Sequence, residues 1–96
     1  MKTRAEIIKV LSKNRTELEK CFKVQKLALF GSYARGEQRD ESDVDILVDV
    51  DPSIGLEFVT LAESIEKMLG IHVEVVSRKA IKPRALKLIE QELIYV

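Results

Sequence analysis

Two aspartates, Asp43 and Asp45, stand two residues apart in a segment where apolar residues occupy the alternate positions up to Val50. Alternate residues of a strand project from the same face, with backbone positions roughly 7 Å apart. Two such carboxylates repel each other and raise each other's pKa unless a cation offsets their charge. Mg²⁺ takes oxygen ligands and is commonly held by one or two carboxylates together with substrate phosphates. The pair is therefore a candidate magnesium site, and the alternative is that both acids face water from an exposed strand.

A glycine turn precedes this pair, in the sequence Gly31-Ser-Tyr-Ala-Arg-Gly36. Glycine lets the backbone approach a ligand closely, and the unpaired N–H groups at the start of a helix attract an anion. Ser32 stands at the expected N-cap of a short helix, and its hydroxyl adds another donor. Gly31 and Ser32 could therefore cradle one or two phosphates of a nucleotide, although such turns commonly cap helices without binding any ligand.

A third acid, Glu74, lies in a segment that also alternates, with apolar residues at positions 71, 73 and 75. Glu74 is on the opposite face, as Asp43 and Asp45 are on their own strand. If the two apolar faces share one core, the three carboxylates share the other side of the sheet. Glu74 could then complete a metal shell or accept the proton of an attacking hydroxyl. The alternative is a solvated residue on an amphipathic strand.

Three further side chains are weaker candidates. Arg35 could reach phosphate, or it could pair with a carboxylate of residues 37–51, which hold seven acidic side chains and one basic one. We favour the pairing, which would fix the turn. Tyr33 is a candidate to touch a nucleotide base, and His72 is interpreted as a surface residue.

The periodicity predicts the elements that must position these residues. Apolar residues at helical spacing indicate helices, and short alternating or continuous apolar runs indicate strands. The expected fold is a small α/β (α+β) sheet of three strands covered by helices, in the order αβαβαβα. The expected bounds are a helix from N-cap Thr3 to Lys20, a strand at Lys26–Phe30, a short helix ended by Gly36, a strand at Asp43–Val50, a helix ended by Gly70, a strand at Ile71–Val76, and a last helix from Pro83 with Leu86, Ile89 and Leu93 inside.

Composition limits the class of protein. Ninety-six residues, 46% hydrophobic and 33% charged, are expected to form one domain over residues 1–96. Sixteen basic and 16 acidic side chains give a net charge of zero, which disfavours nucleic acid as a partner. No apolar run is long enough for a membrane span or a signal peptide. A single cysteine, Cys21, excludes an intramolecular disulfide, so the cytoplasm is the expected compartment.

The glycine turn and the aspartate pair together resemble a known signature. The sequence from Gly31 to Gly36, followed after five residues by Ser42-Asp-Val-Asp45, is similar to the GSxxRG…SDxD motif of the DNA-polymerase-β-like nucleotidyltransferase superfamily. The length and the element order look like its minimal branch, the MNT proteins, which serve as antitoxins to HEPN-domain toxins in bacteria and archaea. The resemblance covers essentially the whole chain.

This resemblance implies a Mg²⁺-dependent transfer of a nucleoside monophosphate from a triphosphate to a hydroxyl, with pyrophosphate leaving. By the same resemblance Gly31 and Ser32 hold the triphosphate, and Asp43 and Asp45 bind two metal ions. Glu74 matches the position of the third acid, which is Asp in many members.

Size then restricts the acceptor. Larger members of the superfamily add domains that hold the acceptor, so here it is expected on another chain. We expect transfer of AMP from ATP to a hydroxyl, with tyrosine as the expected acceptor, on a partner HEPN toxin. The alternative is a non-catalytic antitoxin that neutralises its partner by docking. Modification of a small molecule or an RNA end is disfavoured by the size and the zero net charge.

Overall fold

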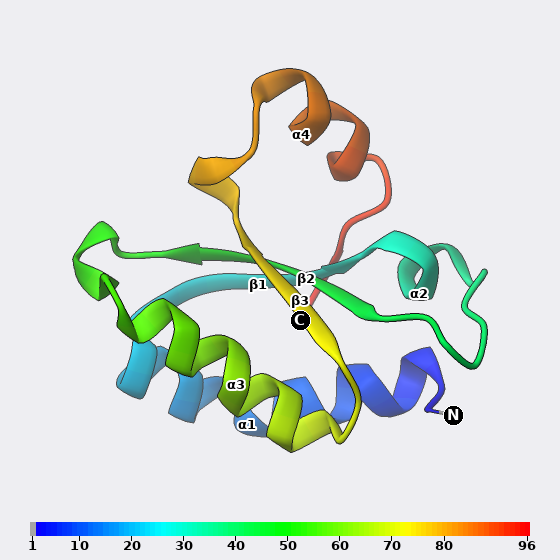
Figure 1. Cartoon of the computed structure of the whole chain (residues 1–96), viewed down its shortest axis with the longest axis horizontal. Helices are drawn as coiled ribbons and strands as arrows, with labels where there is room; N and C mark the ends of the chain where they lie inside the picture. Colours follow the sequence, from blue (N-terminus) through cyan, green and yellow to red (C-terminus); the bar gives the residue numbers. More distant parts are fainter. Residues whose placement is uncertain (1) are drawn as a thin grey trace.

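A four-stranded mixed sheet in the order β3-β2-β1-β4 organises the structure, a computed structural model that describes residues 2–96 (Figure 1). Strand β1 pairs antiparallel with β2 and β4, and β2 pairs parallel with β3. The elements are α1 (Arg4–Phe22), β1 (Val24–Phe30), α2 (Gly31–Arg35), β2 (Val44–Val50), a 3₁₀ turn (Pro52–Ile54), α3 (Glu57–Leu69), β3 (Val73–Ser77), a 3₁₀ turn (Arg78–Ala80), α4 (Pro83–Glu90) and β4 (Ile94–Tyr95). The mixed α/β fold with helices flanking a small sheet is thus confirmed.

Helices α1 and α3 cover one face of the sheet, and α4 lies over the other (Figure 1). Helix α1 begins with a capping box, because the Thr3 hydroxyl accepts from the Glu6 N–H while the Glu6 carboxylate accepts from the Thr3 N–H. Gly70 ends α3 in the left-handed conformation, as predicted. The apolar stripes of these two helices pack on the inner side chains of β1 and β2. The fully buried members are Ile7, Leu11, Leu18, Leu29, Val44, Ile46, Val48, Leu61, Ile65 and Leu69.

The pairing register decides which side chains meet on the second face of the sheet. Val44, Ile46 and Val48 of β2 are fully buried against α1 and α3, so the intervening residues of β2 face the other way. Asp45 is paired in register with Glu74 of β3 on one side and with Phe30 of β1 on the other. The predicted parity of the carboxylates is therefore correct.

The end of the chain differs from the prediction. Helix α4 stops at Glu90, so Leu93 is not on its inner face, and residues 94–95 form the unpredicted strand β4. Strand β4 pairs beside β1, and the Val96 N–H donates to the Leu27 carbonyl at 2.9 Å. The Arg15 guanidinium also donates to the Val96 carbonyl. Leu86 and Ile89 are partly buried, as expected for an inner face, and only the extension of the helix to Leu93 is wrong.

Across residues 2–96, none of the helices has the length and apolar character that crossing a membrane requires.

Candidate functional site

A cleft of about 490 Å³ opens on the second face of the sheet, between α2 and the last part of α4 with the residues that follow it. Its floor comes from β2 and β3, and its rim comes from the turn at the end of β1. All six site residues predicted from the sequence line this cleft, although they come from separate segments of the chain. The lining residues are Phe30, Gly31, Ser32, Arg35, Ser42, Asp43, Asp45, Glu74, Leu88, Ile89 and Glu92.

The acids Asp43, Asp45 and Glu74 lie on the cleft floor. Asp45 is half-buried in the middle of the sheet, whereas Asp43 and Glu74 are exposed. Burial, together with the negative charges of Glu74 and Asp43, raises the pKa of Asp45 to about 6. The positive charge of Arg35 opposes this increase in the pKa of Asp45 but does not cancel it.

These acids do not enclose an ion by themselves. Within the part of the chain that the structure describes, no three His, Cys, Asp or Glu side chains lie close enough together to hold a metal. A Mg²⁺ ion in the cleft would therefore take its remaining ligands from phosphate and water, as this ion commonly does. Carboxylate oxygens, which Asp43 and Asp45 present to the cleft, are of the ligand type that such an ion takes.

Gly31 is required by close contact with Asp45. Its φ of +76° is in the region that L side chains rarely adopt. A Cβ atom at this position would lie 2.1 Å from the Asp45 Oδ2 atom. The glycine turn and the carboxylate are therefore packed directly against each other, so an anion bound at the Gly31 backbone would lie beside any cation held by Asp45.

The start of α2 differs in detail from the prediction. Helix α2 begins at Gly31, and its N-cap is the extended residue Phe30, with no side-chain cap hydrogen bond. Ser32 is therefore a residue of the first turn and not the N-cap, although it still lines the cleft. Tyr33 is 2% exposed and belongs to the core, so the hypothesis that it touches a nucleotide base is wrong.

Arg35 pairs with two carboxylates at the cleft rim. Its guanidinium lies 3.3 Å from Glu37, a member of the acidic segment, as the structural interpretation predicted. It also lies 2.9 Å from Glu92, which sequence reasoning did not identify. The hydrogen bond to Glu92 is the main cause that raises the pKa of Arg35. Arg35 therefore ties the α2 turn to the end of the chain.

Glu92 also accepts from the Gly31 N–H, with its Oε2 atom 2.5 Å from the nitrogen. It follows α4, 61 positions after Gly31, and belongs to no motif. No sequence signal indicated this residue, because the acidic segment 37–51 already offered partners for Arg35. His72, by contrast, is exposed at the sheet edge, where it hydrogen bonds to Glu66 at 3.2 Å and lies 3.9 Å from Asp43. The hydrogen bond to Glu66 raises the pKa of His72.

The site thus combines a glycine turn packed against a carboxylate of the next strand with two more acids in the same cleft. Residues 7–96 match the family described as the nucleotidyltransferase domain. The chain belongs to this family, and it is a nucleotidyltransferase.

Comparison with individual proteins narrows the class. The chain is 41% identical over 98 residues to the protein adenylyltransferase MntA of Thermococcus cleftensis. The alignment covers 100% of this chain and 98% of the relative. It is 48% identical over 101 residues, and 100% of both chains, to MJ1379 of Methanocaldococcus jannaschii, which carries a provisional name as a protein adenylyltransferase.

Solved structures agree with the fold and with the class. One described provisionally as a minimal nucleotidyltransferase has a TM-score of 0.72 at 33% identity, over 95% of this chain and 89% of that chain. A toxin–antitoxin complex crystallised with AMP-PNP has a TM-score of 0.64 at 26% identity, over 96% of this chain and 70% of that one. The chain is therefore similar over nearly its whole length to minimal nucleotidyltransferases of toxin–antitoxin systems.

Proposed function

We propose that this protein uses Mg²⁺ to transfer AMP from ATP to a hydroxyl of a HEPN-class toxin, with a tyrosine as the acceptor, and so acts as the antitoxin. The observation that carries the proposal is the direct packing of Gly31 against Asp45 in a cleft that also contains Asp43 and Glu74. This packing supports a turn that binds phosphate beside a carboxylate that binds a cation. The name of the Thermococcus relative and the AMP-PNP complex support adenylyl transfer and a toxin partner.

The nucleotide is held by the glycine turn in this proposal. The Gly31 N–H and the Ser32 hydroxyl donate to the phosphates, and Arg35 is close enough to the turn to add a charged donor. Asp43 and Asp45 hold the metal, which when bound neutralises phosphate charge and orients the attacking and leaving oxygens. Displacement at phosphorus needs positioning and charge neutralisation more than covalent catalysis, and these groups are of the types that provide both.

The transfer itself is a substitution at the α-phosphorus. The acceptor oxygen forms a bond to that phosphorus, and the bond to the bridging oxygen breaks, so that pyrophosphate leaves with the electron pair. The proton of the acceptor hydroxyl goes to a carboxylate. Glu74 is exposed on the floor of the cleft and adjacent to Asp45 in the register, so it can either accept this proton or complete the metal shell.

A mass measurement on the partner tests this function. The protein is co-expressed with a HEPN-domain toxin, and this partner is analysed for an AMP adduct while growth rescue is scored. The parent protein should give both adduct and rescue, and the Asp43→Asn/Asp45→Asn double variant should give neither. Asp49→Asn is the matched control, because Asp49 is also a half-buried acid of β2 but does not line the cleft.

The Glu74 variants address the third acid and the rival function. Glu74→Gln should lower transfer by about 10²-fold, the usual contribution of a general base, whereas Glu74→Asp should stay active. Full growth rescue by the Asp43→Asn/Asp45→Asn variant without any adduct would reject catalysis and favour an antitoxin that acts by docking alone.

A further inference from the structure

Glu92 lies in the cleft where the proposed function places nucleotide phosphate. We propose that its carboxylate is a built-in competitor, which occupies the phosphate-binding turn in the nucleotide-free protein and must be displaced when a triphosphate binds. The inference rests on the proposed function, because it takes the Gly31 turn as the phosphate site. It adds a residue that sets nucleotide affinity.

The contacts of Glu92 are those expected of a phosphate. Its Oε2 atom accepts from the Gly31 N–H at 2.5 Å and from Arg35 Nη1 at 2.9 Å, and its Oε1 atom lies 3.2 Å from the same nitrogen. A backbone N–H at a glycine turn and a guanidinium are the two kinds of donor that recognise phosphate and carboxylate alike. The side chain is 23% exposed, so the carboxylate sits largely within the cleft.

The charge of the cleft points the same way. Glu92 adds a fourth carboxylate to those of Asp43, Asp45 and Glu74, and Arg35 is the single Lys or Arg among the described lining residues. While Glu92 is bound, the incoming phosphates find their donors occupied and an extra negative charge nearby. When Glu92 leaves, both donors become free for phosphate and the repulsion of phosphate by its charge is removed, so both changes favour nucleotide binding.

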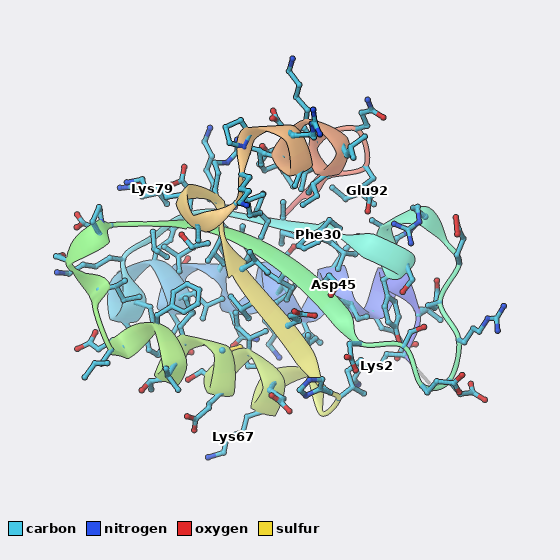
Figure 2. All side chains as sticks on the ribbon, turned by 45° about the horizontal axis from the view of Figure 1, so that its top comes forward. Lys2, Phe30, Asp45, Lys67, Lys79 and Glu92 are labelled. Atoms are coloured by element: carbon cyan, nitrogen blue, oxygen red, sulfur yellow. The ribbon has the colours of Figure 1, made fainter. Side chains whose placement is uncertain are left out.

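The segment that carries Glu92 is held mainly after this residue, where β4 pairs with β1 and Ile94 and Val96 pack against the core. Glu92 lies between α4, in which no residue is fully buried, and the two-residue strand β4. In Figure 2, Glu92, Phe30 and Asp45 follow one another from the end of α4 to the middle of the sheet. Displacement of Glu92 therefore needs only a rotation of its side chain out of the cleft, which leaves β4 paired with β1.

Calorimetric titration with Mg²⁺–ATP tests the competition in the full chain. We compare the parent protein with Glu92→Ala and Glu92→Gln, after thermal melts establish that each variant is folded. If the parent site is open about one tenth of the time, Glu92→Ala should lower the apparent Kd about tenfold. Glu92→Gln should lie between the two, because its amide oxygen still accepts from the Gly31 N–H. The matched control is Glu37→Gln, which removes the other carboxylate beside Arg35, at 3.3 Å, and leaves the turn occupied.

Each outcome separates this inference from the proposed function. Tighter binding by both Glu92 variants, with less than about a twofold change for Glu37→Gln, supports the competitor role. Unchanged or weaker binding of Mg²⁺–ATP by folded Glu92→Ala overturns the competitor role. Glu92 would then have only a structural role, through its bonds to Gly31 and Arg35. An equal gain for Glu37→Gln also overturns the competitor role, since general charge removal would then suffice. Absence of binding by the parent and by Glu92→Ala alike rejects the proposed nucleotide site itself.

Discussion

A single methyl group at Gly31 is expected to be severely destabilising. The residue has a φ of +76°, and an added Cβ would meet the Oδ2, Cγ and Cβ atoms of Asp45 at 2.1, 2.9 and 3.1 Å. The left-handed conformation costs an L-residue about 1–2 kcal/mol. Asp45 would also have to leave its rotamer, which costs about 0.5–1.5 kcal/mol more. Gly31→Ala should therefore lower the free energy of unfolding by about 2–3 kcal/mol in total.

Urea denaturation with a matched glycine separates the two contributions. Gly36 ends the same helix with a φ of +73°, and a Cβ added there would meet no atom within 4 Å, so Gly36→Ala reports the backbone cost alone. Gly31→Ala should cost more than Gly36→Ala in the parent background. In an Asp45→Ala background, which removes the two nearest atoms, most of this excess should disappear. Equal costs of the two glycine substitutions in the parent background would refute the steric argument.

Three further predictions concern stability and binding. Folding raises the pKa of Asp45 from 3.8 to about 6, chiefly by burial, so the folded state holds this proton more tightly and stability falls as the pH rises through that interval. Without metal, Asp45→Asn should reduce this dependence of stability on pH and raise the free energy of unfolding at pH 7.5 by about 1–2 kcal/mol, after allowance for solvent screening. Urea melts in EDTA check this, and equal pH dependence in both proteins would contradict it. Thr3→Ala should cost about 1 kcal/mol in thermal melts because it removes the α1 cap, whereas Thr16→Ala, at an exposed position within α1, should be nearly neutral. Ser32→Ala should weaken Mg²⁺–ATP binding by about 1 kcal/mol in a calorimetric titration, and unchanged affinity would remove Ser32 from the phosphate site.

Alternation along strands made the acidic face of the sheet predictable. Because successive side chains of a strand point to opposite faces, the buried positions of Val44 and Val73 determine where Asp45 and Glu74 must lie. This argument needs no knowledge of the strand order, and the observed register places the two acids in direct pairing. Gly36 and Gly70 were similarly predictable, since a left-handed residue at a helix end favours glycine.

Features that depend on distant contacts were not predictable. Strand β4 has two residues, too few to show any alternation, and it forms because β1 offers an unpaired edge. The start of α2 depends on the backbone of Phe30 and Gly31, so the preference of serine for N-caps placed Ser32 wrongly at the cap. Glu92 reaches Gly31 only after the chain has crossed the sheet, and no local pattern encodes that meeting.

The connection from β3 to β4, residues 78–93, forms a strap over the sheet whose sequence can change faster in evolution than the sequence of the sheet. Residues 78–93 run from one edge of the sheet to the other over β2 and β1, and no residue of α4 is fully buried. Substitutions on this strap should have small effects on folding, whereas its last turn is bound to the cleft through Glu92. Descendants of one ancestral sequence could therefore vary residues 78–93 more freely than the sheet and its acids.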